Sequence, residues 1–179
     1  RAYKLARNEI DATLVLLGNI ATDDPEGDDV YRSLLDERDE RTIILSQQDS
    51  ALVNALQCRS AVVLQKSIRE GFGLTVTEAM WKGTPVIGGN CGGIRHQIED
   101  GVTGFLVDSV EEAAERIVEL VSDPGKAEEM GAKAKETVRK RFLLSRLLEE
   151  YLDLMAGFEA KYILKDAPGA GRETGREAS

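Results

Sequence analysis

Short apolar runs alternate with helix-like segments along this chain, and this alternation limits the folds open to it. The apolar runs are residues 13–17, 43–45, 61–64, 85–87 and 105–107. Each is short and rich in Val, Ile and Leu, as a strand covered on both faces should be. Between them lie segments with helical spacing, and three helices are expected at residues 110–122, 125–141 and 143–158. Repeated strand–helix units predict an α/β protein with a doubly wound parallel sheet.

Shorter helices are expected at residues 30–38, after a cap at Ser50, after residue 73 and from Ile94. Residues 1–8 are typical of the end of a helix. The acidic residues 23–29 do not have the ligand spacing of a calcium loop and predict a turn-rich loop. We expect one domain over residues 1–158 and a tail over 159–179, disordered from about residue 167.

Composition excludes several classes of function. The formal net charge is −9, which argues against nucleic acid or an anionic membrane as a partner. No apolar run approaches the ~20 residues of a membrane-spanning helix, and residues 1–4 do not resemble a signal peptide. Cys58 and Cys91 lack the spacing of a metal site or a disulfide framework. The sequence therefore predicts a cytoplasmic protein with free thiols.

Residues 70–79, EGFGLTVTEA, place two acids around a glycine-rich turn between an expected strand and an expected helix. Gly71 and Gly73 allow a sharp turn and a close approach of the backbone to a ligand. The start of the helix offers free N–H groups and the positive end of the helix dipole, which favour a phosphate. Glu70 and Glu78 beside an anion site make sense if they bind hydroxyl groups. A nucleotide sugar has both the diphosphate and the hydroxyls.

This segment resembles the E-x7-E motif of retaining glycosyltransferases with the GT-B fold. The resemblance continues through residues 78–80, 83–87, 92–94 and 100–107, and covers about residues 13–158. It implies the Rossmann-like, C-terminal, donor-binding half of such an enzyme. Residues 67–70 (SIRE) and 80–83 (MWKG) are most similar to trehalose glycosyltransferring synthases, which join the glucose of a nucleotide sugar to free glucose.

The resemblance also implies roles for individual residues. Glu70 would be the catalytic residue and would accept hydrogen bonds from hydroxyls of the donor glucose, and Glu78 would accept them from the ribose. Backbone N–H groups after Gly73 would face the diphosphate, and the nucleotide base would lie near the turn that follows residue 45. The donor-binding residues would be Arg69, Gly71, Phe72, Gly73, Leu74, Thr75, Glu78, Gly92, Gly93, Leu45 and Ser46. No metal and no cofactor is expected, because helix N–H groups and cations hold the diphosphate in this family.

In the family, an Arg and a Lys for the diphosphate precede the region that matches this chain, and the acceptor site lies in an N-terminal domain. The resemblance thus implies a fragment that lacks its N-terminal domain, binds a nucleotide sugar weakly and catalyses little alone. The expected partners are the nucleotide sugar, an acceptor sugar and that missing domain, with a homodimer as a further possibility.

Several alternatives stay open at this point. Thr75 and Glu78 fit a capping box, which would make Glu78 structural. Arg69 has two possible partners, Glu70 and a phosphate, and His96 fits a surface position better than a catalytic base. Enzymes that form sucrose, glycogen or a polysaccharide share the motif, and an inactive domain that binds nucleotide sugars is the regulatory alternative. A receiver-type signalling domain is disfavoured, because no acidic pair follows residues 13–18 at the right distance.

Overall fold

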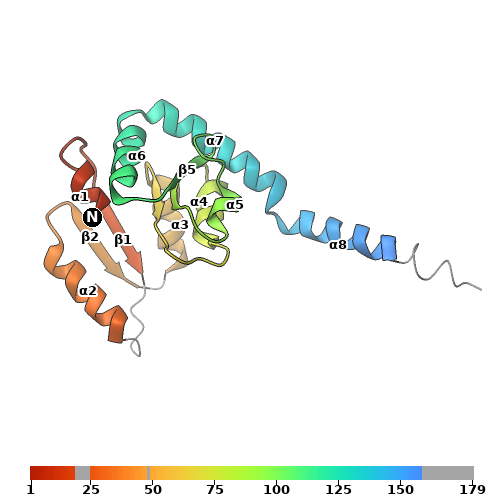
Figure 1. Ribbon diagram of the computed structural model, residues 1–179, viewed down its shortest axis with the longest axis horizontal. Coiled ribbons are helices and arrows are strands. Elements are labelled where there is room, and N and C mark those ends of the chain that lie inside the picture. The colour runs from red at the N-terminus through yellow and green to blue at the C-terminus, as the bar shows by residue number, and fades with distance from the viewer. Residues whose placement is uncertain (19–24, 48, 159–179) are drawn as a thin grey trace, which may run out of the picture. The chain divides into compact units, whose positions relative to one another are not determined.

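The computed structural model describes residues 1–18, 25–47 and 49–158, with the side chains of residues 25–28 not described. Its chain forms two compact units, Arg1–Val138 and Arg139–Ser179. Figure 1 shows that the first unit contains all the described strands, together with helices α1 to α6 and most of α7. Among the described residues, no helix is long and apolar enough to cross a membrane.

The described strands form two parallel sheets. β1 (Leu14–Gly18) pairs with β2 (Thr42–Ser46), and Leu14 lies opposite Thr42. The second sheet has the order β3 (Val63–Gln65), β4 (Val86–Gly89) and β5 (Gly104–Val107). All these pairs are parallel, and the strands alternate with helices along the chain. The predicted α/β class with parallel strands is therefore confirmed, with the described ladders divided between two sheets.

Eight helices fall in the described part of the chain. They are α1 (Ala2–Ala6), α2 (Pro25–Glu37), α3 (Ser50–Arg59), α4 (Leu74–Trp81), α5 (Ile94–Gln97), α6 (Val110–Ser122), α7 (Pro124–Arg141) and α8 (Leu144–Phe158). Two expectations were wrong here. Residues 25–29 belong to α2 and not to an acidic loop, while residues 23 and 24 lie outside the described part. Asp49, not Ser50, caps α3, because its carboxylate accepts from the N–H groups of Ala51 and Leu52.

The core of the first unit lies around β4, whose four residues are all buried. Ile87 contributes to a cluster with Phe105 of β5 and with the inward face of α6, including Ile117 and Leu120. A cavity of about 460 Å³ lies between β1 and β3, lined mainly by aliphatic side chains such as Leu14. β3 is thus paired with β4 on one side and borders the cavity on the side of β1.

Two contacts hold α6 and α7 to this core. The guanidinium of Arg116 in α6 lies over the ring of Phe105, 4.6 Å from its centre. The ammonium of Lys126 in α7 lies 5.9 Å from the same ring centre. Gly131 of α7 packs so closely on the carbonyl of Gly83 that an added Cβ would overlap the oxygen. The contacts with Phe105 hold α6 and the start of α7 to β5, and the contact of Gly131 holds α7 to the loop that follows α4.

Candidate functional site

Two loops meet at the carboxyl ends of β3 and β4. Because β3 and β4 are parallel neighbours, the loops that follow them leave the same edge of the sheet. The first loop carries Glu70, and the second carries Gly92 and Gly93. The N–H of Gly93 donates to the carbonyl of Glu70 at 3.3 Å. The structure therefore brings together Glu70 and the two glycines, as the resemblance implied.

The contact between the two loops leaves no room for a side chain at Gly92 or Gly93. At Gly92, which has φ of +47°, an added Cβ would overlap the carbonyl oxygen of Glu70, and at Gly93 it would overlap backbone atoms of Gly71 and Phe72. Around Gly71 there is open space, so its lack of a side chain has no such packing reason. The second loop thus acts as a close-fitting backbone support for the first.

α4 begins directly after the first loop. Its N-cap is Gly73, whose φ of +88° is a left-handed conformation that favours glycine. Leu74 and Thr75 are the first two helical residues, so their N–H groups have no partner within the helix. Thr75 is therefore not the N-cap, and the capping-box alternative for Glu78 is wrong. The helix offers N–H groups at the position where the motif predicts a diphosphate.

A short chain of hydrogen bonds orients Glu70. The Glu70 carboxylate is half-buried and accepts from Ser67 Oγ at 3.3 Å, and Ser67 Oγ accepts from Gln65 Nε2 at 3.0 Å. The Cys91 thiol donates to the carbonyl of Ser67 at 3.0 Å and joins the second loop to this chain. Arg69 lies exposed beside Glu70. Glu70 thus has a defined position and is only partly buried.

Glu78 lies four residues after Leu74, the first residue of α4, and is exposed. Its Oε2 accepts from Gln57 Nε2 at 3.3 Å, and Gln57 is a buried residue of α3. The sequence pattern did not predict a role for Gln57. Its contact with Glu78 spans 21 residues, and only its position four residues after Val53, on the inward face of α3, hinted at burial.

Gln97 is a second functional candidate that the sequence pattern did not predict. It is 1% exposed, and its Nε2 donates to the carbonyl of Phe72. Its Oε1 is buried with no hydrogen-bond partner among the described residues. Gln97 thus holds the backbone of the first loop at Phe72. His96, the residue before it, is exposed.

Leu45 and Ser46 lie at the carboxyl end of β2. This strand belongs to the other sheet, so these residues come from a different sheet than the loop that carries Glu70. Phe72 and Leu74 are 45% and 67% exposed, which leaves apolar surface next to the two acids.

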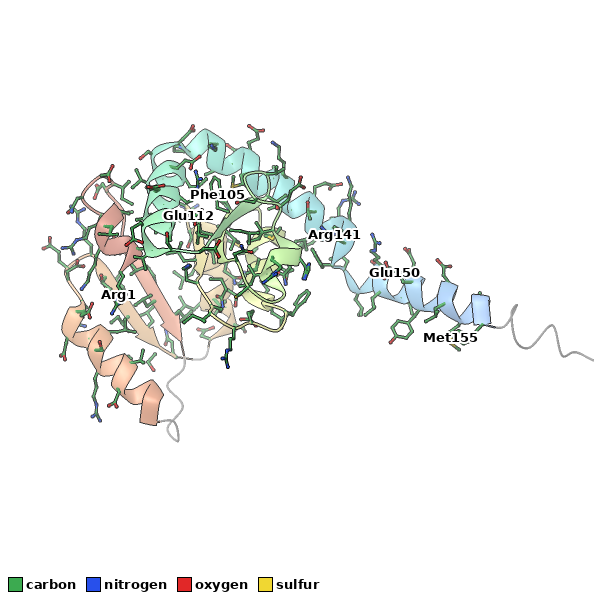
Figure 2. The ribbon with its side chains drawn as sticks, in the orientation of Figure 1. Arg1, Phe105, Glu112, Arg141, Glu150 and Met155 are labelled. Atoms are coloured by element: carbon green, nitrogen blue, oxygen red, sulfur yellow. The ribbon has the colours of Figure 1, made fainter. Side chains whose placement is uncertain are left out.

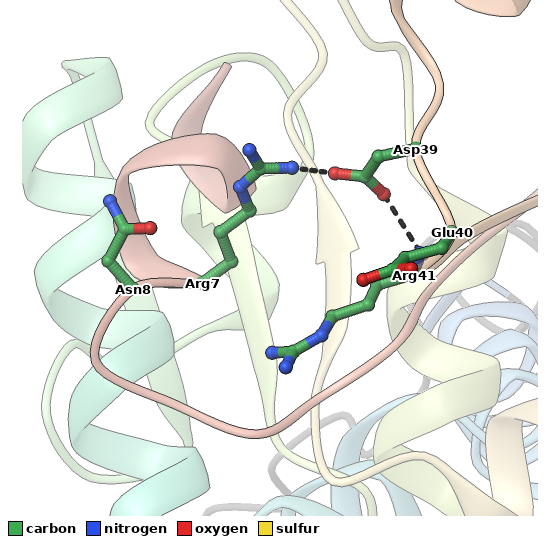
Figure 3. A pocket seen from close by; sticks show the side chains of 5 residues that line it. All are labelled: Arg7, Asn8, Asp39, Glu40 and Arg41. Carbon is green, nitrogen blue, oxygen red and sulfur yellow. Dashed lines mark hydrogen bonds and ion pairs between the residues drawn. The ribbon is translucent and has the colours of Figure 1, made fainter.

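A separate hollow of about 500 Å³ opens near the start of β2, lined by Arg7, Asn8, Asp39, Glu40 and Arg41 (Figure 3). Arg7 forms an ion pair with Asp39, and Asp39 also accepts from the backbone N–H of Arg41 at 3.0 Å. Two cations and two carboxylates line this hollow, so it has no excess charge for an anionic ligand. It also lies at the amino end of β2, away from the strand edge where ligands bind in such sheets.

The described residues contain no group of three or more His, Cys, Asp or Glu side chains placed to hold a metal ion. The groups around the Glu70 loop and the start of α4 are two carboxylates, backbone N–H groups and the apolar side chains of Phe72 and Leu74. Such a set suits a ligand that has both an anionic group and several hydroxyls.

Comparisons with known proteins identify the family of this chain. The family model "Glycosyl transferases group 1" matches residues 1–137. The trehalose synthase of Pyrococcus horikoshii is 48% identical over 159 residues, which are 86% of this chain and 38% of that enzyme. The chain therefore spans about two fifths of the length of this curated relative.

Two solved structures share the fold. A sucrose-phosphate synthase from Thermosynechococcus elongatus has a TM-score of 0.75 at 23% identity, over 89% of this chain and 42% of that chain. The Anabaena protein HepE, solved with UDP and glucose, has a TM-score of 0.71 at 22% identity, over 81% of this chain and 40% of that chain. At these identities the likeness shows the fold alone.

Proposed function

Because this chain belongs to the group 1 glycosyl transferases, we propose that it is the donor-binding domain of a retaining enzyme that transfers glucose from a nucleoside-diphosphate glucose to an acceptor sugar. The observation that carries the proposal is the packing of the Glu70 loop on Gly92 and Gly93, directly before the start of α4. This arrangement sets a carboxylate beside free helix N–H groups.

Each part of the donor has a matching group. The diphosphate lies at the N-terminus of α4, where N–H groups and the helix dipole stabilise the negative charge that grows as the glycosidic bond breaks. Glu70 accepts hydrogen bonds from hydroxyls of the glucose, and Glu78 from the ribose. Arg69, exposed beside Glu70, is free to reach a phosphate. The base lies near Leu45 and Ser46.

The acceptor we propose is glucose, with trehalose as the product. This finer assignment is supported by the identity to trehalose synthases, which is much higher than the identity to the solved structures. An enzyme that forms sucrose or a polysaccharide is the alternative within the same fold. The acceptor site belongs to the part of the relatives that this chain does not span, so the chain alone should bind donor and transfer little.

No divalent metal takes part in the proposed reaction, because the start of α4 supplies the positive field that a metal would otherwise provide. EDTA should then leave transfer activity intact. Loss of activity with EDTA and its return with Mg²⁺ or Mn²⁺ would contradict this part of the proposal.

The test uses a chimera in which this chain replaces the matching segment of the Pyrococcus horikoshii trehalose synthase. With UDP-glucose or ADP-glucose and free glucose, the chimera should form trehalose. Glu70→Gln should lower kcat by about 100-fold or more, the loss expected for one key transition-state contact. Glu78→Gln should instead mainly raise KM for the donor.

Glu115→Gln is the matched control, because Glu115 is an exposed acid on α6, outside the proposed site. It should leave both kinetic constants unchanged. A chimera with Glu70→Gln that keeps the unmodified kcat would overturn the assignment of Glu70, and an unmodified chimera that folds and forms no trehalose would overturn the proposed donor-binding role.

A further inference from the structure

The buried side-chain amide of Gln57 links α3 to two charged side chains. One is Glu78 of α4, and the other is Lys82, the residue that follows α4. Gln57 is 5% exposed, and its Nε2 donates to Glu78 Oε2 at 3.3 Å. On its other side, Lys82 Nζ donates to Gln57 Oε1 at 2.5 Å. The amide therefore lies between an acid and an ammonium group, in contact with both.

The two neighbours fix the orientation of this amide. A carboxylate only accepts hydrogen bonds and an ammonium only donates them, whereas an amide has one side of each kind. Only one orientation satisfies both, with the oxygen toward Lys82 and the NH₂ toward Glu78. A turned amide would place its oxygen against the carboxylate and its NH₂ against the ammonium, which is repulsive on both sides.

The backbone of Gln57 is fixed as well. Its carbonyl accepts from Thr84 Oγ1 at 2.5 Å, and Thr84, just before β4, is 4% exposed. The last turn of α3 is thereby tied to the sheet. The hydrogen bond to Glu78 thus starts from a point that has little freedom to move.

Glu78 itself lies on the surface, where a glutamate without support samples several side-chain rotamers. We infer that Gln57, held by Lys82, is a positioning residue that presents the Glu78 carboxylate to the ribose hydroxyls and makes the site select ribonucleotides over deoxyribonucleotides. This inference rests on the proposed function, because it takes a nucleoside diphosphate as the ligand and Glu78 as its ribose contact.

The experiment titrates the full chain with UDP and with 2′,3′-dideoxy-UDP by calorimetry. The unmodified chain should bind UDP at least tenfold more tightly, the effect of a hydrogen bond to a charged group. Gln57→Met keeps the size of the side chain and removes both amide contacts, so the ratio of the two affinities should fall to about twofold. Lys82→Met removes one of the two side-chain contacts that hold the amide and leaves the contact with Glu78, so its ratio should lie between these values.

Asn54→Met is the matched control, because Asn54 is exposed on the same helix. It should keep the ratio of the unmodified chain. Thermal unfolding reports whether each variant is folded. Because Lys82 is only half-buried, Lys82→Met keeps the test open if Gln57→Met does not fold.

Glu78→Gln separates the two ways in which the inference can fail. If it removes the preference for UDP while Gln57→Met and Lys82→Met keep it, Glu78 binds the ribose without help and only the positioning role is wrong. If Glu78→Gln keeps the full preference, or the unmodified chain binds no UDP, the proposed ribose contact is wrong and the inference fails with it. A merely structural role of Gln57 would lower both affinities equally and leave the ratio unchanged.

Discussion

Gly92 is the residue on which the shape of the Glu70 loop depends most directly. Its positive φ and its contact with the carbonyl of Glu70 both exclude a side chain. We predict that Gly92→Ala weakens binding of UDP by tenfold or more and lowers the unfolding temperature, since a left-handed alanine alone costs about 1 kcal/mol. Calorimetry and thermal unfolding measure the two effects.

Gly125→Ala is the comparison variant for this prediction. The nearest atom to a Cβ at Gly125 is a side-chain oxygen of Asp123 at 3.4 Å, an ordinary contact. This variant should bind UDP as the unmodified chain does. Equal affinities for Gly92→Ala and Gly125→Ala would show that the loop does not need the contact at position 92.

Single residues of the site were predictable to different degrees. Glu70, Gly92 and Gly93 were expected to share one site because the resemblance to the glycosyltransferase motif implies it, and the strand pattern placed the Glu70 turn at the carboxyl end of a strand. Gln57 and Gln97 were not found, because their contacts with Glu78 and Phe72 span 21 and 25 residues. A pattern of neighbouring residues carries no information on such a distant partner.

At the scale of elements, apolar periodicity located most segments well. The limits predicted for the helix at residues 110–122 agree with those of α6. The start of α2 was missed because Pro25 suits the first turn of a helix as well as a turn. The cap of α3 was misplaced by one residue, since Asp49 and Ser50 are both good capping residues.

The corner between α6 and α7 contains an acid whose titration should affect stability. The hydrogen bond from Lys126, together with one from Arg116, lowers the pKa of Glu119 below its ordinary value of 4.5. An acid with a lowered pKa in the folded chain stabilises the fold above the pKa of the unfolded chain. This stabilisation is lost as the pH falls through the lower, folded-state pKa.

We therefore predict that Glu119→Gln lowers the free energy of unfolding at pH 7 by about 0.5 kcal/mol, a small value because the ion pairs are partly exposed to solvent. The difference should shrink as the pH falls below 4.5. Urea unfolding at pH 7 and pH 3.5 measures it, with Glu115→Gln on the same helix as the control. A difference of equal size at both pH values would contradict the electrostatic explanation.

α7 depends on a close contact of its own. In Gly131→Ala, the new Cβ would overlap the carbonyl oxygen of Gly83, whereas in Gly157→Ala of α8 it would meet nothing within 4 Å. Both changes raise helix propensity by about 1 kcal/mol. We predict a lower unfolding temperature for Gly131→Ala and no loss for Gly157→Ala. A stabilised Gly131→Ala variant would mean that α7 shifts to accept the methyl group.

At the scale of the whole molecule, α8 stands out for its uncovered apolar side chains. It has no buried residue, and its apolar residues are between 50% and 78% exposed. They are Leu144, Leu147, Leu148, Tyr151, Leu152, Leu154, Met155 and Phe158. Figure 2 labels Met155 on this helix together with Glu150, which pairs with Arg146 at 2.7 Å.

An apolar stripe of this size is unfavourable in water. We predict that the chain associates with a second copy through α8, as sedimentation velocity over a range of concentrations would show. Leu148→Glu should shift the protein toward the monomer, whereas Glu149→Gln on the polar side should not. A chain that is monomeric at every concentration would contradict the prediction.

The parallel arrangement of the strands was predictable from the alternation of strands and helices. The division of the described strands into a two-stranded and a three-stranded sheet was not. Apolar runs show that a strand is buried without showing which strand lies beside it. The cavity between β1 and β3 is a property of side-chain packing between segments about 50 residues apart. Local sequence patterns do not determine such packing.

The support of the Glu70 loop by residues 92–97 has a consequence for synthesis on the ribosome. β3, β4 and β5 pair in the order in which they are made, so each new strand can join the strand made just before it. The loop with Glu70 emerges early, but Gly92, Gly93 and Gln97 leave the ribosome more than twenty residues later. A nascent chain that stops before Gln97 has both acids of the motif but lacks the hydrogen bond from Gln97 to the first loop, so we expect the proposed donor site to form only after the end of α5 has been released.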